Sequence, residues 1–240
     1  MIFAAGLGTR LKPLTDTMPK ALVPLSDKPL IQWQIEKLVA YGITDIVVNV
    51  HHFPDQIIDF LHSRDWGASI AVSDERDVLL ETGGGLYKAM ATYGANEPWL
   101  ICNVDILSNL RLDHVMAAYN PDELGVVVVS QRDTQRYLCF DDSLRLCGWT
   151  NVATGELRHQ DGTHLAFSGF SILSPQALPL LEHFAKEQGE KFSLIDFYLQ
   201  VCNTQTFRAY IPNQYRMMDV GKIDQLSDAE RFAASLQHGG

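Results

Sequence analysis

A glycine-rich loop and two cations lie near the start of the chain. The segment AAGLGTRLKPLTDTMPKALVPL, residues 4–25, contains Gly6-Leu7-Gly8 and carries Arg10 and Lys20. Glycines let backbone N–H groups approach phosphate oxygens closely, and successive amides in such a loop form an anion-binding nest. A planar guanidinium and a mobile ammonium suit charge that spreads over phosphoryl oxygens. The segment predicts a phosphate-binding loop, the alternative being a structural turn with two solvated cations.

The loop differs from two common nucleotide motifs. No G-K-[ST] follows the glycines, so it is not a Walker loop. Leu11 stands where a dinucleotide fingerprint has its third glycine, and the second predicted strand runs into Asn49-Val50-His51-His52 without an acid. A nicotinamide-dependent oxidoreductase is therefore disfavoured.

Two aspartates are candidate metal ligands. Asp105 follows the apolar segment WLICN, and the carboxyl ends of parallel strands are where α/β sheets place their ligands. Mg²⁺ prefers one or two protein carboxylates together with phosphate oxygens and water. Asp219, which precedes Val220 and Gly221, either joins Asp105 as a ligand or caps the last helix.

Short helices and strands that alternate through the first half would position these residues. Residues 30–41 place Ile31, Ile35, Leu38 and Val39 on one helical face, with Gln34, Glu36 and Lys37 away from it. Similar patterns predict strands at 2–5, 45–50, 69–73, 99–103 and 125–130, and further helices at 54–64, 84–93 and 112–119. This alternation implies parallel strands joined by crossovers.

The pattern changes after residue 130. Residues 136–174 predict antiparallel strands, with Asp141-Asp142 and Asp161-Gly162 as turn signals. Helices are predicted at 175–188, at 194–202 and after Gly221, and a strand at 207–211. We predict one α/β domain over residues 1–240, with a nucleotide-binding half at 1–130 and an acceptor-binding half at 131–240.

Composition excludes several classes of protein. The chain has 240 residues, 46% of them hydrophobic, and a formal net charge of −10, which argues against nucleic acid or an anionic membrane as the main partner. No apolar run approaches the roughly 20 residues that span a bilayer, and no signal peptide is visible. The four cysteines form no C-x-x-C pair, so we expect reduced, mostly buried thiols in a cytoplasmic protein.

Two polar clusters receive ordinary interpretations. His51 and His52 are adjacent, so their side chains point to opposite faces of a strand and a shared metal is disfavoured. The run Asp74-Glu75-Arg76-Asp77 predicts a solvated surface turn, with a role in base specificity as the alternative.

The motifs together resemble those of the sugar-1-phosphate nucleotidylyltransferases. After the N-terminal loop, ETGGGLYKA (81–89), NVD (103–105), FSGFSILSP (167–175) and MMDVG (217–221) follow in the family's order, so the resemblance covers nearly the whole chain. Within that family, LETGGG and FSG are similar to the short uridylyltransferase type that activates N-acetylmuramate 1-phosphate in bacterial cell-wall recycling.

The resemblance implies both a fold and a reaction. The fold would be a Rossmann-like three-layer α/β fold with a mixed sheet, of the nucleotide-diphospho-sugar transferase type. The reaction would be Mg²⁺-dependent transfer of a nucleotidyl group from an NTP to a sugar 1-phosphate, giving an NDP-sugar and pyrophosphate. UTP and N-acetylmuramate 1-phosphate are the expected substrates, and a monomer or small homo-oligomer is expected. The alternatives are GTP with mannose or heptose 1-phosphate, or a catalytically silent sugar-nucleotide sensor.

The resemblance also implies roles for individual residues. Arg10, Lys20 and Asp105 would be catalytic, and Asp105 and Asp219 would hold Mg²⁺. The implied nucleotide-binding residues are Ala5, Gly6, Leu7, Gly8, Thr9, Glu81, Thr82, Gly83 and Asn103. The implied sugar-binding residues are Tyr137, Ser168 and Gly169.

Overall fold

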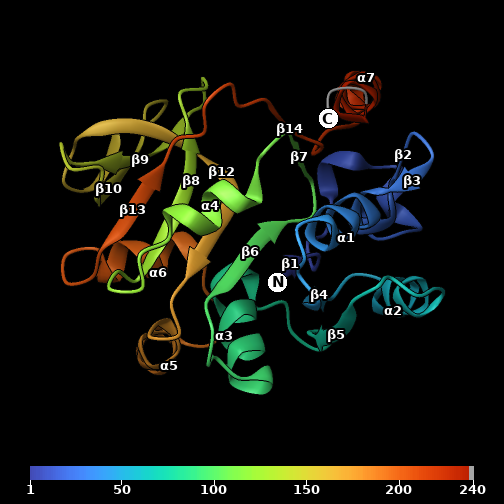
Figure 1. The fold of residues 1–240 in the computed structure, drawn as a ribbon, viewed down its shortest axis with the longest axis horizontal. Helices are drawn as coiled ribbons and strands as arrows, with labels where there is room; N and C mark the ends of the chain where they lie inside the picture. The colour runs from blue at the N-terminus through green and yellow to red at the C-terminus, as the bar shows by residue number, and fades with distance from the viewer. Residues whose placement is uncertain (238–240) are drawn as a thin grey trace. The chain divides into compact units, whose positions relative to one another are not determined.

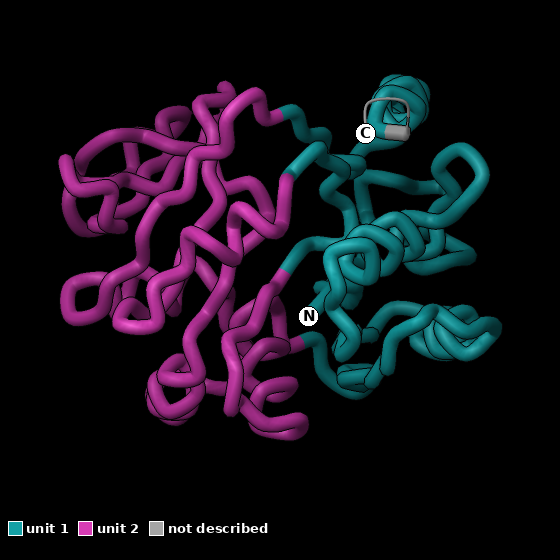
Figure 2. Tube along the Cα trace, in the orientation of Figure 1, with its two compact units in different colours: residues 1–79, 102–110, 216–240 teal, residues 80–101, 111–215 magenta. Residues whose placement is uncertain are grey.

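The structure, a computed structural model, describes residues 1–237 and divides into two compact units (Figure 2). Unit 1 comprises residues 1–79, 102–110 and the C-terminal segment from 216, and unit 2 comprises residues 80–101 and 111–215. Neither unit is a continuous stretch of chain. The assignment of residues 1–130 to the nucleotide and 131–240 to the acceptor therefore stays a prediction.

Unit 1 is built on short parallel strands. Strand β1 (Ile2–Phe3) pairs in parallel with β4 (Asp45–Val50) and with the end of β6 (Trp99–Asn103), and β4 pairs in parallel with β5 (Ser69–Asp74). These strands are visible in Figure 1 in blue to green. The predicted parallel pairing is confirmed, and it brings the carboxyl ends of β1, β4 and β6 to one edge.

Helices and small ladders complete unit 1. The helices are α1 (Leu30–Ala40), α2 (Pro54–His62) and α7 (Leu226–Gln237), with 3-10 turns at Thr9–Leu11, Leu14–Asp16, Lys20–Leu22 and Ile223–Gln225. Two antiparallel ladders pair β2 (Pro24–Leu25) with β3 (Lys28–Pro29), and β7 (Ile106–Ser108) with β14 (Met217–Asp219).

The face of α1 differs from the one predicted by its hydrophobic spacing. Ile31, Ile35 and Leu38 are buried as expected, but Gln34 is also buried and donates to the backbone oxygen of Ile106. Lys37 points the same way. Its Nζ donates to the backbone oxygen and the hydroxyl of Ser108 at 2.9 and 3.0 Å. The prediction that Gln34 and Lys37 lie away from the packed face is wrong, because β7 supplies polar partners there.

We expect Lys37 to make stability rise with pH in the alkaline range. Burial lowers the pKa of Lys37 from 10.5 to about 8, so the unfolded chain binds this proton more tightly than the folded chain does. The cost of burying the charged ammonium destabilises the folded protein fully below about pH 8. This cost disappears as the ammonium loses its proton between about pH 8 and pH 10.5, so the free energy of unfolding rises. Cys102 acts in the opposite sense above about pH 9, because burial raises the pKa of its thiol to about 11.

The variant Lys37→Met isolates this contribution. The free energy of unfolding of the wild type minus that of Lys37→Met should rise by about 1 kcal/mol between pH 7.5 and pH 9 in urea titrations. The Cys102 contribution largely cancels in this difference. A difference that stays constant over that range would show that Lys37 is not desolvated.

Unit 2 contains a mostly antiparallel sheet. Strands β9 (Arg136–Phe140), β10 (Leu146–Asn151) and β11 (Glu156–His159) form a meander, and β12 (Thr163–Leu173) pairs with β9 and with β8 (Gly125–Ser130). Strand β13 (Phe207–Tyr210) adds a parallel pair to β8. The antiparallel arrangement predicted for residues 136–174 is confirmed.

Unit 2 also contains helices, which are labelled in Figure 1: α3 (Glu81–Tyr93), α4 (Leu112–Ala118), α5 (Ala177–Gln188) and α6 (Leu194–Val201). Its core includes an aromatic pair: the ring centroids of Tyr198 and Phe207 lie 4.4 Å apart, and the buried hydroxyl of Tyr198 donates to Ser171 at 2.9 Å. Within residues 1–237, no helix is both long enough and apolar enough to cross a membrane.

Candidate active site

The loop that follows β1 requires glycine at one position. Gly8 has φ +63°, and a Cβ there would lie 2.8 Å from Cγ2 of Thr15 and 2.9 Å from Cβ of Lys20. Thr15, which is buried, donates from its hydroxyl to the backbone oxygen of Gly8 at 2.8 Å. Gly8 therefore lets the loop turn tightly against the segment that carries Lys20. Gly6 faces open space, and Leu7, Thr9 and Arg10 are exposed.

A buried polar network holds the start of this loop. The backbone N–H of Ala4 donates to Oδ1 of Asn49 at 2.7 Å, and Nδ2 of Asn49 donates to Oε1 of Glu75 at 2.8 Å. Glu75 is only 2% exposed, so the predicted solvated turn at 74–77 is wrong for this residue. The sequence analysis did not predict that these two side chains pair. The available signal was the asparagine inside an apolar strand, because a buried amide needs a hydrogen-bond partner.

Lys20 and Asp105 are joined by an ion pair. The ammonium of Lys20 donates to Oδ2 of Asp105, and the two side chains are 12% and 15% exposed. The two residues are 85 positions apart in the chain. The fold therefore places one of the predicted cations directly on the predicted metal-binding acid, in a setting where water screens their interaction only partly.

Asp219 is brought beside Asp105 by the β7–β14 ladder. Asp219 pairs with Ile106, and the backbone N–H of Val220 donates to the backbone oxygen of Asp105 at 2.8 Å. Helix α7 begins at Leu226, and Lys222, not Asp219, occupies the N-cap position of the 3-10 turn before it. The alternative that Asp219 caps the last helix is therefore wrong, since it ends a strand next to the other acid.

Gly221 provides the space in which Arg10 and Asp219 approach each other. A Cβ at Gly221 would lie 2.6 Å from Oδ1 of Asp219 and 2.8 Å from Nη2 of Arg10. The guanidinium and the carboxylate thus flank the same point. Unit 1 by itself brings together Arg10, Lys20, Asp105 and Asp219.

The two carboxylates of this group fit a hard divalent cation, and the two cations fit phosphate. Asp105, directly before β7, and Asp219, at the end of β14, offer carboxylate oxygens next to each other. Mg²⁺ takes one or two carboxylates and completes its shell with phosphate and water. Because Gly221 has no side chain, Arg10 and Asp219 approach its backbone more closely than a methyl group would allow. Together the four side chains can bind a complex of a metal ion with polyphosphate. The carboxylates would face the metal ion, and the ammonium and guanidinium would face the phosphate oxygens.

The predicted base-binding residues start a helix in unit 2. Glu81, Thr82 and Gly83 form the first turn of α3, which begins three residues earlier than predicted. The Gly83 amide donates to the backbone oxygen of Phe192 at 2.9 Å, and the Thr82 hydroxyl accepts from the amide of Leu194 at 2.9 Å. The Gly83 amide and the Thr82 hydroxyl thus form hydrogen bonds with the backbone of this protein. Contact of Glu81, Thr82 and Gly83 with a nucleotide base stays a prediction.

The predicted sugar-binding residues lie on the sheet of unit 2. The Tyr137 ring stacks on His164, and its hydroxyl accepts from the amide of Thr134 at 3.0 Å. Ser168 is fully buried and donates to the hydroxyl of Ser130 at 3.3 Å. Gly169 has φ +76°, where β12 is irregular. A role in sugar binding stays a prediction for all three residues.

Comparison with known proteins assigns the family. The sequence profile of the MobA-like NTP transferase domain matches residues 1–200. The chain belongs to this family. An N-acetylmuramate alpha-1-phosphate uridylyltransferase of Caulobacter vibrioides (strain ATCC 19089 / CIP 103742 / CB 15) is 39% identical over 186 residues, which cover 73% of this chain and 75% of that protein. A mannose-1-phosphate guanyltransferase of Hypocrea jecorina is 34% identical over 142 residues, covering 57% of this chain and 39% of that protein.

Solved structures agree on the fold of this NTP transferase. HddC from Yersinia pseudotuberculosis superposes with a TM-score of 0.78 at 24% identity, and 97% of each chain is covered. At that identity the likeness shows the fold alone. The expected Rossmann-like mixed α/β fold is confirmed. The family match together with the likeness to the Caulobacter enzyme confirms the expected enzyme class, a sugar-1-phosphate nucleotidyltransferase.

Proposed function

We propose that this NTP transferase moves the uridylyl group of UTP onto N-acetylmuramate 1-phosphate in a Mg²⁺-dependent reaction that releases pyrophosphate. The observation that carries the proposal is the Lys20–Asp105 ion pair, with Arg10 and Asp219 flanking Gly221 in the same unit. The choice of substrates is supported by the 39% identity to the Caulobacter enzyme, whose match covers three quarters of that protein.

The residues define a simple route for the reaction. An oxygen of the sugar phosphate attacks the α-phosphorus of UTP in line, a P–O bond forms, and the bond between the α-phosphorus and its bridging oxygen to the β-phosphate breaks. A phosphate monoester is already ionised near neutral pH, so no general base is required. Catalysis then consists of positioning and stabilisation of charge.

Each charged side chain has a separate task in this scheme. Lys20 leaves its ion pair with Asp105 and bridges the α-phosphate and the incoming sugar phosphate. Arg10 stabilises the charge that grows on the pyrophosphate leaving group. Asp105 and Asp219 would hold Mg²⁺, which supplies neutralisation of phosphate charge when bound. The backbone amides around Gly8 would hold the triphosphate in a nest.

Guanylyl transfer is the second candidate. It is favoured by the 34% identity to the fungal mannose-1-phosphate guanyltransferase, although this match covers a smaller share of both chains. A catalytically silent sensor is disfavoured, since a protein that only binds nucleotide does not need two cations and two acids converging on one point.

Pyrophosphate release with four NTPs against a panel of sugar 1-phosphates tests the proposal. We expect turnover with UTP and N-acetylmuramate 1-phosphate, and its loss when EDTA removes divalent cations. Turnover only with GTP and mannose 1-phosphate would show that the proposed substrates are wrong, while the enzyme would still be a sugar-1-phosphate nucleotidyltransferase. Tight binding of sugar nucleotides without turnover on any pair would favour the sensor.

A further inference from the structure

Side chains that commonly bind transition metals cluster in unit 2. The Sγ of Cys139, a carboxylate oxygen of Asp161 and a ring nitrogen of His164 all lie within 4.8 Å of one another. Oδ1 of Asp161 is 2.6 Å from Nε2 of His164 and 3.8 Å from Sγ of Cys139. Cys139 is buried, whereas Asp161 and His164 are exposed, so the two exposed side chains lie between the thiol and solvent, where an ion could reach them.

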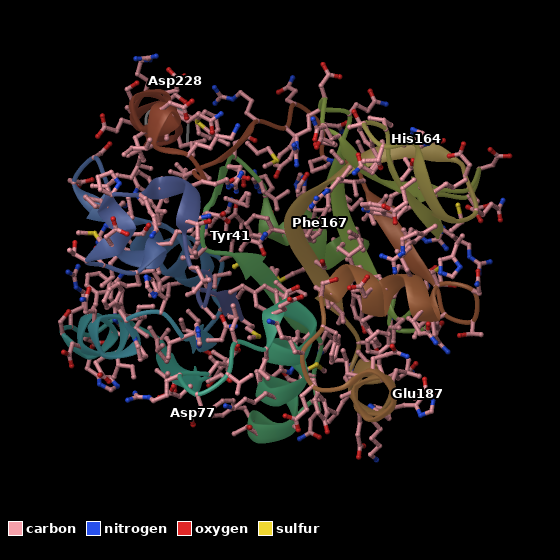
Figure 3. All side chains as sticks on the ribbon, turned by 180° about the vertical axis from the view of Figure 1, so that it is seen from behind. Tyr41, Asp77, His164, Phe167, Glu187 and Asp228 are labelled. Carbon is pink, nitrogen blue, oxygen red and sulfur yellow. The ribbon has the colours of Figure 1, made fainter. Side chains whose placement is uncertain are left out.

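The sheet register brings two of these residues together. Cys139 on β9 and His164 on β12 are direct cross-strand partners, so their side chains lie on the same face. Figure 3 labels His164 on the strands of unit 2. The ring of Tyr137, two residues before Cys139, stacks on His164 with centroids 5.7 Å apart and limits its movement.

A tight turn brings in the carboxylate. Asp161 lies between β11 and β12, and the amide of Gly162 donates to its Oδ1 at 2.9 Å. A Cβ at Gly162 would lie 2.3 Å from the backbone oxygen of Phe140, so only glycine lets the turn approach β9 this closely. The close backbone approach of Gly162 to Phe140 therefore holds Asp161 next to Cys139.

A second thiol lies beside the cluster. Cys147 lies at the irregular point of β10, between Leu146, which pairs with Phe140, and Gly148, which pairs with Cys139. Its Sγ lies 3.3 Å from the backbone oxygen of Cys139 and 3.9 Å from that of Asp161. Rotation of this half-buried side chain toward Asp161 would add a fourth donor.

The carboxylate of Asp161 places a negative charge beside the Cys139 thiol, with Oδ1 3.8 Å from Sγ, and this charge favours a bound cation. A thiol that coordinates a divalent ion gives up its proton to solvent.

We propose that Cys139, Asp161 and His164, with Cys147 as the fourth ligand, form a site for a borderline-soft divalent ion, namely Zn²⁺. Sulfur, imidazole and carboxylate ligands in a tetrahedron are typical of Zn²⁺, whereas Mg²⁺ prefers oxygen ligands alone. Binding replaces the His164–Asp161 hydrogen bond and releases the two thiol protons. The ion would join β9, β10, β12 and the turn before β12.

Titration of the metal-free full-length protein with Zn²⁺ tests this site. We expect one equivalent to bind with micromolar or tighter affinity and to raise the melting temperature. Co²⁺ in place of Zn²⁺ should give the charge-transfer absorption of a thiolate–Co²⁺ bond. Neither readout depends on catalysis, so both are independent of the proposed function.

Variants locate the ion. Cys139→Ser and His164→Asn should each weaken Zn²⁺ binding by about 10-fold or more. His164→Asn changes an exposed residue, so it gives a valid answer even if Cys139→Ser fails to fold. Cys202→Ser, which removes a buried thiol outside the cluster, should bind Zn²⁺ as the wild type does. The proposal is overturned if no Zn²⁺ binds below millimolar concentration, if His164→Asn binds normally, or if Asp105→Asn abolishes binding.

Discussion

Replacing Asp105 by asparagine is expected to lower kcat/KM by about 10³-fold or more while the protein stays folded. Asparagine has nearly the same shape but lacks the negative charge that would bind Mg²⁺ and that now pairs with Lys20. The substitution removes stabilisation of charge in the transition state more than it weakens substrate binding. We therefore expect kcat to fall by a larger factor than KM rises.

Pyrophosphate release with saturating and limiting substrates measures this effect. The matched control is Asp113→Asn, which removes an exposed carboxylate paired with Arg111 and should leave the rate unchanged. Circular dichroism melts of both variants should show folded proteins. A full rate for Asp105→Asn would refute its role as a metal ligand, and with it the mechanism proposed for this site.

Replacing Gly221 by alanine is expected to lower kcat/KM by about 100-fold with little change in melting temperature. The added methyl would lie 2.6 Å from Oδ1 of Asp219 and 2.8 Å from Nη2 of Arg10, so the carboxylate and the guanidinium must both move away. The ends of two side chains can yield without unfolding the protein. Gly221 does not have the positive φ that would strain alanine, so the backbone itself tolerates the substitution.

The control for Gly221→Ala is Gly155→Ala in the turn between β10 and β11. That glycine has φ +73° with open space around it, so alanine there should lower stability modestly and leave activity unchanged. Comparison of kcat/KM and melting temperature for the two variants separates displacement of Arg10 and Asp219 from a general effect of losing glycine. Wild-type kcat/KM in Gly221→Ala would mean that the precise placement of Arg10 and Asp219 does not matter.

Polar residues inside the fold were the ones most often misplaced by sequence reasoning. Gln34, Lys37 and Glu75 were predicted on the surface, yet each finds a polar partner on another element. Their partners Ile106, Ser108 and Asn49 are separated from them by 72, 71 and 26 positions. Hydrophobic spacing describes a helix by itself, so it contains no information about a carbonyl or hydroxyl that another strand will supply.

The residues of the N-terminal loop were predicted from type and local spacing, because a glycine turn followed by Arg10 is a feature of neighbouring residues. Hydrophobic patterns likewise determined the alternating parallel elements and the antiparallel stretch after residue 130, since side-chain period depends only on local backbone geometry. Only the tertiary structure decided that Lys20 meets Asp105, that Asp219 lies in a strand rather than capping a helix, and that Cys139 lies beside His164. Each of these contacts joins distant parts of the chain through strand register and close backbone approach, which are set when the whole sheet packs.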